Sequence, residues 1–162
     1  LKTELSKENQ SMLRSIQSTK NSIAIHIRRG DYAKNLQTRN HHGVLPISYY
    51  QEGFQRIKEL VTNKKDFVCF VFSDDVEWVK KNLKINASVV FVEINNSFNE
   101  GQFDIELMKN CNHFIIANST FSWWGAWLSQ NESKIVISPK NWFAKESINH
   151  TIELIPEEWI TL

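Results

Sequence analysis

Short apolar segments alternate along the chain with longer, more polar segments. Five apolar segments are rich in Ile, Val and Phe and predict β-strands, at Ser22–Arg28, Asp66–Phe72, Val89–Ile94, His113–Ala117 and Lys134–Ser138. Four of the five are apolar almost throughout. Such segments are typical of strands that are covered on both faces, as in parallel sheets.

The intervening segments predict helices, at Leu1–Ser18, Pro46–Val61, Asp74–Leu83, Gln102–Cys111 and Phe121–Ser129. Strands that alternate with helices predict an α/β fold, here a Rossmann-like parallel sheet with helices on both faces. The irregular segments Arg39–Leu45 and Asn95–Gly101 predict loops. The segment Asn141–Asn149 and the tail Pro156–Thr161 show no clear preference for helix or strand.

Composition narrows the class of protein. The 162 residues are 41% hydrophobic and 23% charged, which fits one domain spanning residues 1–162, since domains usually hold roughly 100–200 residues. A net charge of +1 argues against a protein that binds nucleic acid or acidic membranes through bulk charge. No apolar run approaches the ~20 residues of a transmembrane helix, and we expect no secretion signal. Cys69 and Cys111 lie in apolar segments, which predicts buried thiols in a reducing compartment.

The residues that follow each strand are candidates for chemistry, because parallel α/β sheets bind ligands beyond the carboxyl ends of their strands. The first strand runs into Arg28 and Arg29, and arginine suits bidentate contacts with phosphate or carboxylate. The pair is therefore either a pyrophosphate clamp or a structural pair bridged to Asp31 or another carboxylate. Alternation along this strand predicts two faces, with Ile23, Ile25 and Ile27 on one and Ala24, His26 and Arg28 on the other.

The second strand runs into a pair of aspartates. Asp74 followed by Glu77 has the spacing of a helix capping box, which is the interpretation we favour for Asp74. Asp75 is left either to accept a hydrogen bond from a ribose or base, or to favour the helix N-terminus electrostatically.

The fourth strand runs into a turn of small polar residues, Asn118, Ser119, Thr120 and Ser122. Backbone N–H groups at such a strand-to-helix junction form an anion site, and the alternative is an ordinary Ser/Thr helix cap. The nearby indoles Trp123, Trp124 and Trp127 predict an aromatic cluster, more typical of a core than of a ligand platform.

Asp104 shares one face of its predicted helix with apolar residues, at Leu107, Met108 and Cys111. An acid on a buried face needs a partner. It caps its helix, pairs with an arginine, or accepts hydrogen bonds from the N–H groups of a ligand.

Two segments resemble a known family. The segment from His26 to Tyr32 is similar to the His-x-Arg-Arg-x-Asp motif of the inverting GDP-fucose-dependent α1,2-fucosyltransferases, and the segment from Asp104 to Trp124 resembles that family's second, longer motif. The likeness runs from about Ile23 to Trp142.

The resemblance implies the C-terminal, donor-binding half of a GT-B-like glycosyltransferase, and we expect the N-terminal, acceptor-facing half to be absent from this chain. It implies transfer of L-fucose from GDP-fucose to the 2-hydroxyl of a galactose-terminated glycan, with inversion. The alternatives are a transferase for another nucleotide sugar and a non-catalytic binding module. We expect no metal and no nucleic-acid partner, and a cytoplasmic protein of bacterial type that can associate peripherally with the inner membrane.

Residue roles follow from the resemblance together with the strand ends. The predicted catalytic residues are Arg28, Arg29 and Asp31, with Asp31 either acting as a base or orienting an arginine. Backbone N–H groups near Ser119 and Thr120 are expected to assist. The predicted substrate-binding residues are His26, Arg28, Arg29, Asp75, Asp104, Asn118, Ser119, Thr120 and Ser122.

Overall fold

A parallel sheet forms the centre of the computed structural model, which describes residues 4–62, 66–95, 97, 99–145 and 154–162. Its six strands have the order β3-β2-β1-β4-β5-β6, and each neighbouring pair is parallel. In chain order the strands are β1 (Asn21–Ile27), β2 (Phe67–Ser73), β3 (Ser88–Phe91), β4 (His113–Ile115), β5 (Val136–Ser138) and β6 (Ile160–Thr161). The chain reverses its direction of travel across the sheet between β1 and β4, and such switch points in open α/β sheets hold ligands.

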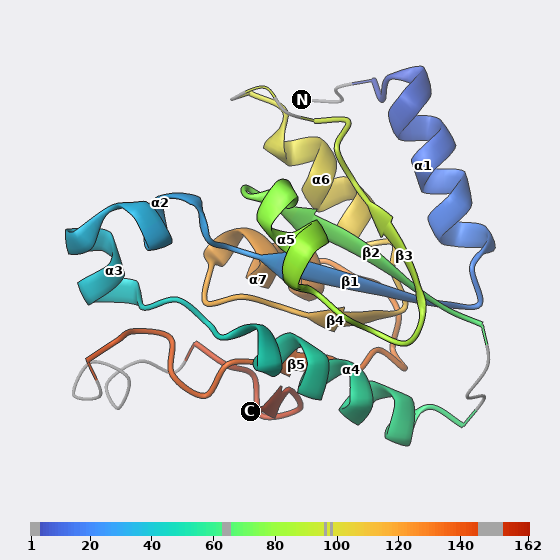
Figure 1. The fold of residues 1–162 in the computed structure, drawn as a ribbon. Coiled ribbons are helices and arrows are strands. Elements are labelled where there is room, and N and C mark those ends of the chain that lie inside the picture. Colours follow the sequence, from blue (N-terminus) through green and yellow to red (C-terminus); the bar gives the residue numbers. More distant parts are fainter. Residues whose placement is uncertain (1–3, 63–65, 96, 98, 146–153) are drawn as a thin grey trace.

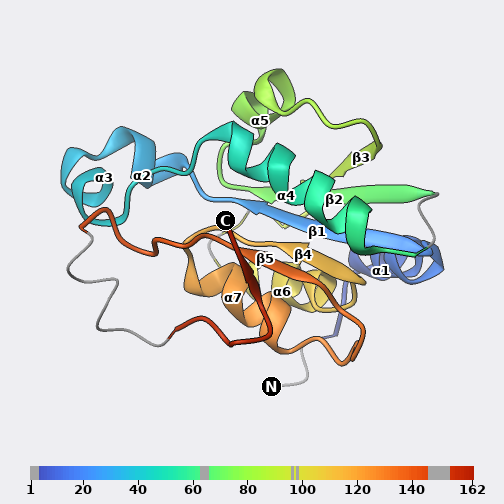
Figure 2. The same cartoon turned by 90° about the horizontal axis from the view of Figure 1, so that it is seen from below.

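Helices cover both faces of the sheet, as predicted. Figure 2 shows α4 (Ile47–Leu60) and α5 (Val76–Asn82) on one side, and α1 (Lys7–Ser18), α6 (Gly101–Met108) and α7 (Thr120–Trp127) on the other. Two short helices, α2 (Gly30–Lys34) and α3 (Leu36–His42), lie beyond the carboxyl end of β1 (Figure 1). The fold prediction is confirmed.

The alternation predicted for the first strand is also confirmed, because its two faces pack into different cores. Ile23 and Ile25 are fully buried in the core beneath α4. Ala24 belongs to the opposite core, which contains Leu107 and Met108 of α6. Each core excludes water from one face of β1, so β1 cannot shift by one residue without exposing apolar side chains. The register of β1 therefore fixes the direction of the side chains at its carboxyl end.

Two sequence-based predictions of local structure were wrong or incomplete. Four of the seven residues of the expected loop Arg39–Leu45 are helical, because α3 continues to His42. The side chain of Asn35 caps α3 by accepting hydrogen bonds from the N–H groups of Gln37 and Thr38, a signal too short to stand out between two helices. The tail Pro156–Thr161 contributes the sixth strand, β6, which pairs with β5.

The other predicted segments match with small shifts at their ends. Asn95–Gly101 is irregular up to the start of α6, as predicted. Residues 141–145 of Asn141–Asn149 are described and belong to no helix or strand, and the rest of that segment lies outside the described residues, as do residues 1–3 of the predicted helix Leu1–Ser18.

Both cysteines are buried and free, as predicted. Burial raises the pKa of the Cys69 thiol to about 12 and also raises that of Cys111. None of the helices in the described ranges has the length and apolar character needed to cross a membrane.

Candidate active site

The carboxyl ends of β1 and β2 open into a cavity of 690 Å³, here called the first cavity. His26 and Arg28 reach it from β1 and the residue after its end, Asp104 from α6 and Phe121 from α7. Asp75 lines it at the start of α5. The fold therefore brings together four of the predicted site residues from three separate segments of the chain.

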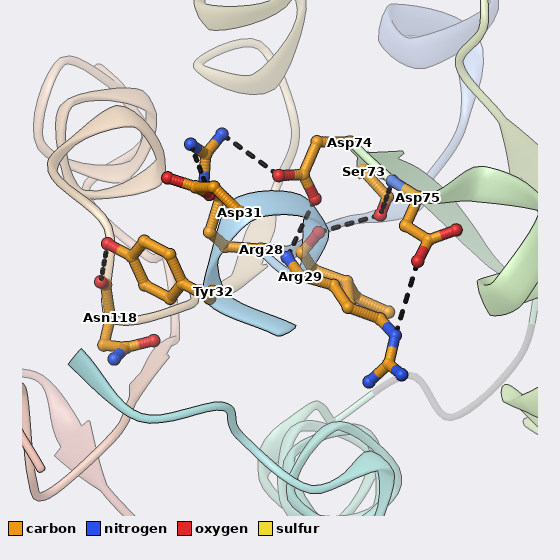
Figure 3. Close-up of polar contacts among 9 residues, drawn as sticks. Arg28, Arg29, Asp31, Tyr32, Ser73, Asp74, Asp75 and Asn118 are labelled. Carbon is orange, nitrogen blue, oxygen red and sulfur yellow. Dashed lines mark hydrogen bonds and ion pairs between the residues drawn. The ribbon is translucent and has the colours of Figure 1, made fainter. Parts of the chain in front are cut away.

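Arg28 is held between two carboxylates (Figure 3). One of its terminal nitrogens lies 2.9 Å from Asp31 Oδ1 and the other 3.2 Å from Asp74 Oδ2. The ring of Tyr32 lies beneath the guanidinium, with its centre 5.4 Å away. These contacts fix the direction in which Arg28 points before any ligand arrives.

Asp74 does not cap the following helix, so the capping-box prediction was wrong. The residue that precedes α5 is Asp75, whose side chain makes no capping hydrogen bond. Asp74 instead accepts a hydrogen bond of 2.8 Å from the N–H of Arg29. A side chain on Gly30 would obstruct this approach, since its Cβ would lie 2.7 Å from Asp74 Oδ2. Any larger residue at this position would have to displace the Asp74 carboxylate.

Arg29 points to the other side of the strand end. Its Nε lies 3.4 Å from Asp75 Oδ2, and its guanidinium lies over the ring of Trp78, 3.7 Å from the ring centre. It lines a second cavity, of 330 Å³, which also contains Arg39 and the residues at the start of α4. Figure 3 shows the two arginine side chains diverging from the strand end. The predicted single clamp is thus divided between two cavities.

His26 is 5% exposed, and its ring lies 5.2 Å from that of Phe121. Burial, together with the positive charge of Arg28, lowers the pKa of His26 to about 3. The imidazole is therefore neutral at physiological pH. It offers a ligand one donor and one acceptor and is a weak base.

Asp104 has an amide partner that links it to a distant helix. Asn95 Nδ2 donates a hydrogen bond of 2.7 Å to Asp104 Oδ1 and one of 2.9 Å to Asn9 Oδ1 on α1. Asn9 Nδ2 returns a bond of 2.7 Å to Asn95 Oδ1. Two of the expected partners, a helix cap and an arginine, were wrong. The expectation that Asp104 accepts hydrogen bonds from a ligand stays a prediction.

The environment of Asp104 disfavours ionisation, although the carboxylate still predominates at neutral pH. Burial raises the pKa of Asp104 to about 6, opposed by the hydrogen bond from Asn95 and assisted by the negative charge of Glu100. The Asn95 amide uses one lone pair of the carboxylate, which lines the first cavity and keeps further lone pairs for the N–H groups of a ligand.

The turn between β4 and α7 lies beside this region but lines neither cavity. Asn118 is 2% exposed, and its Nδ2 donates to the backbone oxygens of His42 and Trp142 at 2.6 and 3.2 Å. Tyr32 of the first motif donates from its hydroxyl to Asn118 O at 3.4 Å, so the two motif segments meet here.

The hydroxyl residues of this turn differ in exposure. Ser122 is fully buried, and its hydroxyl donates to Ser119 O at 3.2 Å. The N–H of Ser119 donates to Ala117 O at 2.8 Å and is not open to a ligand. Thr120 is exposed at the start of α7. The roles predicted for these four residues stay predictions.

The indoles on α7 form the expected cluster, but part of it faces solvent. Trp123 stacks on Trp127 with ring centres 5.1 Å apart, and Trp124 meets Trp123 edge to face. Trp124 and Trp127 are each 48% exposed, so the prediction that the cluster lies in the core was wrong for these two residues.

Three residues of the site escaped the sequence analysis. Phe121 stood inside the second motif, where an aromatic residue next to a polar turn could have suggested contact with a ligand. Asn95 lay in a segment that we predicted only as a loop. Trp78 belongs to α5 and becomes a site residue through contact with Arg29, which no local pattern reports.

The two cavities differ in charge. Among the described residues, one arginine and five carboxylates line the first cavity, the acids being Asp74, Asp75, Glu77, Glu93 and Asp104. The lining suits a ligand rich in N–H and O–H donors. The described residues contain no group of three or more His, Cys, Asp or Glu side chains arranged to hold a metal ion, and independence of metals stays a prediction.

The strand order and the cavity beyond the carboxyl ends of β1 and β2 define a Rossmann-like α/β ligand-binding unit. The chain matches Glycosyl transferase family 11 over residues 1–162 and belongs to that family. It is 42% identical over 142 residues to the O-antigen biosynthesis glycosyltransferase WbnK of Escherichia coli, covering 88% of this chain and 45% of that protein. It is 40% identical to an α-1,2-colitosyltransferase of Escherichia coli, covering 88% and 48% of the two chains.

More distant relatives include mammalian proteins. The mouse galactoside 2-α-L-fucosyltransferase Sec1 is 27% identical over 130 residues, which cover 78% of this chain and 34% of that protein. The solved structure of the α-1,6-fucosyltransferase NodZ soaked with GDP-fucose superposes with a TM-score of 0.51 at 15% identity, covering 77% of this chain and 43% of that one. The likeness to NodZ supports the fold. The chain spans about half the length of the bacterial relatives it matches.

Proposed function

We propose that this chain binds GDP-fucose and, within an enzyme of its relatives' length, transfers L-fucose to the 2-hydroxyl of a galactoside with inversion. One observation carries the proposal. Three residues with which the motifs are expected to hold the donor, His26, Arg28 and Asp104, come from β1, the turn after it and α6 and line one cavity beyond the carboxyl ends of β1 and β2. Family membership and the likeness to a mouse galactoside 2-α-L-fucosyltransferase support the reaction.

The acid-lined first cavity suits the nucleoside end of the donor. Guanine presents adjacent N–H donors on its pairing edge, and ribose presents hydroxyl donors. The carboxylate of Asp104 is half-buried, aligned by Asn95, and has acceptor positions to spare for the base. Neutral His26 and the ring of Phe121, inclined to each other by 43°, supply aromatic surface beside the base. In this proposal Asp75, which also lines the cavity, accepts a hydrogen bond from ribose.

The arginines serve the diphosphate end. In the transfer, the acceptor oxygen forms a bond to the anomeric carbon of fucose while the bond from that carbon to the β-phosphate oxygen breaks. The departing oxygen takes the electron pair, so negative charge grows on the β-phosphate. Arg28 and Arg29 stabilise that charge, and donors fixed in advance toward developing charge are the strongest single catalytic device in many enzymes.

Arg28 and Asp31 then divide their roles. Asp31 is a positioning residue in this proposal, because its carboxylate holds the guanidinium of Arg28 at 2.9 Å. The proton of the acceptor hydroxyl passes to a base other than His26, whose pKa of about 3 makes it too weak an acceptor at neutral pH.

Calorimetric titration of this chain with guanosine, GDP, UDP and GDP-fucose tests the proposal. We expect GDP to bind at least about tenfold more tightly than UDP, because a pyrimidine does not reach Asp104 with two N–H donors. Transfer to a galactoside is then measured in the complete protein. A preference for UDP, or no binding of any nucleotide, would overturn the proposal.

A second donor sugar has specific support. A relative 40% identical to this chain is named an α-1,2-colitosyltransferase. Parallel transfer assays with the fucose and colitose donors decide between the two sugars, and the nucleotide-binding part of the proposal is common to both.

A further inference from the structure

Asn9 is a buried polar residue on α1, a helix that takes no direct part in the site. It is 2% exposed, and among the described residues of α1 none lines either cavity. Ile16, seven positions further along the same face of the helix, is apolar and fully buried. Because burying an amide costs free energy that an apolar side chain does not, the amide of Asn9 needs a reason beyond the packing of α1.

The side chain of Asn9 makes its hydrogen bonds with two residues. Its Nδ2 donates to Ser6 Oγ at 3.2 Å and to Asn95 Oδ1 at 2.7 Å, while its Oδ1 accepts from Asn95 Nδ2 at 2.9 Å. Ser6 Oγ also accepts from the backbone N–H of Asn9 at 3.1 Å, so it selects the donor end of the Asn9 amide. The amides of Asn9 and Asn95 therefore form a reciprocal pair with a defined orientation.

This pair determines which end of Asn95 faces Asp104. An amide has two N–H groups on one side and an oxygen on the other. Because Asn9 holds the oxygen of Asn95, the Nδ2 of Asn95 is left to donate both to Asn9 and to Asp104 Oδ1, the latter at 2.7 Å. A reversed Asn95 amide would lose all three bonds and would set its oxygen against two other oxygens.

The bond from Asn95 in turn restricts the rotation of the Asp104 carboxylate. Asp104 and Asn95 both line the first cavity. A ligand with two adjacent N–H donors, such as the pairing edge of guanine, needs a carboxylate in one plane with them, and such two-point contacts depend strongly on geometry. A ligand with one N–H donor tolerates a rotated carboxylate better.

From these contacts we infer that Asn9 is a positioning residue for selection of the base. Acting through Asn95, it holds the carboxylate of Asp104 in the orientation that accepts two adjacent N–H donors. The inference rests on the proposed function in that the base is guanine and meets Asp104. The alternative is that Asn9 only fastens α1 to the segment before α6, in which case it contributes to stability and not to selectivity.

The test measures binding of GDP and of inosine diphosphate by calorimetry. Asn9→Leu removes the amide and keeps a side chain of similar size. The matched control is Gln17→Ala, because Gln17 is an exposed amide on α1 that donates at 3.2 Å to Asn110, just after α6, and does not line either cavity. We expect Asn9→Leu to weaken GDP binding by about fivefold and inosine diphosphate binding by about twofold at most, and Gln17→Ala to change neither. Equal losses for the two nucleotides, or an unchanged affinity for GDP, would overturn the inference.

A double-mutant cycle tests the route through Asn95. In an Asn95→Ala background, Asn9→Leu should have no further effect on GDP affinity, because the link to Asp104 is already gone. Effects that add in full would show that Asn9 acts by another route and would contradict the inference. If Asn9→Leu does not fold, Asn9→Ala removes the same amide without adding methyl groups and carries the same expectations.

A measurement without nucleotide separates this inference from the proposed function. Burial raises the pKa of Asp104 to about 6, and the hydrogen bond from Asn95 opposes that rise. If Asn9 keeps Asn95 in place, Asn9→Leu should move the titration of the Asp104 carboxyl group, followed by NMR, to a higher pH, and Gln17→Ala should not. An unchanged titration would overturn the inference. If the original chain does not prefer GDP to inosine diphosphate, guanine recognition in the proposed function is wrong, and the titration still decides whether Asn9 positions Asp104.

Discussion

The two cavities on either side of the Arg28–Arg29 turn differ in charge, although adjacent residues build both. The first combines Arg28 with five carboxylates, and the second combines two arginines with apolar walls. Consecutive residues at the end of an extended strand point to opposite faces. Arg28 therefore continues the face of His26, and Arg29 continues the face of Ile27. A pair of arginines in sequence is not by itself a single clamp in space.

The two arginines also differ in the contacts that hold their side chains. Asp31 and Asp74 hold Arg28 by ion pairs, whereas the indole of Trp78 holds Arg29 mainly by stacking. A guanidinium fixed by two carboxylates is strongly oriented, and its charge is partly offset by theirs. A guanidinium fixed by an aromatic ring keeps its charge. Replacing Arg28 and replacing Arg29 should therefore have different effects on nucleoside binding and on the reaction rate.

The largest expected effect comes from Arg28→Ala. Loss of a fixed donor aimed at the departing phosphate should lower kcat in the complete protein by about 10²–10³-fold. The change also leaves Asp31 and Asp74 without their partner in an already acidic cavity, so guanosine binding should change along with the rate. Steady-state kinetics and calorimetry measure the two effects.

Arg29→Ala completes this comparison. It should lower the rate while leaving guanosine affinity near that of the original protein, since Arg29 does not line the first cavity. If the two variants lose guanosine affinity equally, the division into two cavities is wrong.

Asp104→Asn is expected to rank second in effect. The amide is nearly isosteric but accepts fewer hydrogen bonds, so GDP should bind about 10–100-fold more weakly. Inosine diphosphate lacks one of the two N–H donors of guanine, so the substitution should weaken its binding less than it weakens the binding of GDP. Comparison of the two nucleotides by calorimetry separates recognition of the base from general damage.

The same variant makes a prediction about pH and stability. Asp104 has a pKa of about 6 in the folded chain against 3.8 ordinarily, so the folded state binds more protons than the unfolded state between these values. Its contribution to the free energy of unfolding falls as pH rises from about 4 to about 6. Asp104→Asn should therefore raise Tm at pH 7 and leave it nearly unchanged at pH 4. A Tm that drops equally at both values would contradict the assigned environment.

Gly30→Ala is expected to have a moderate effect. The new Cβ would lie 2.7 Å from Asp74 Oδ2, and forcing a methyl group into such a contact typically costs about 1–3 kcal/mol. Urea denaturation measures the loss. The control is the same change in an Asp74→Ala background, where the obstructing carboxylate is gone and the cost should shrink. An equal cost in both backgrounds would show that Asp74 is not what requires a glycine.

The smallest predicted effect is that of Asn95→Ala. The hydrogen bond from Asn95 lowers the pKa of Asp104 and so opposes the effect of burial. Its removal should raise the pKa of Asp104 above about 6 and move the loss of GDP binding at acidic pH to a higher pH. Asn82→Ala is a control, because Asn82 is an exposed amide bonded only to the backbone of α5 in the contacts described. A binding profile that does not move would remove Asn95 from the site.

The pattern of apolar residues determined the architecture. Continuous apolar strands joined by helices can bury both sheet faces only in a parallel α/β arrangement, and every predicted strand is present. Alternation along β1 also placed His26 with Arg28. Carried one residue further, it would have placed Arg29 on the opposite face.

Tertiary structure alone decided which side chains became partners. Asn9 and Asn95 lie 86 positions apart and meet only because α1 packs beside α6. Asp74 had the spacing of a helix cap, yet it faces Arg28 because the turn after β1 comes within reach. The second cavity exists only where α4 and α5 approach the segment around α3. Periodicity encodes which face of an element is buried, whereas the identity of a polar partner depends on how distant elements dock.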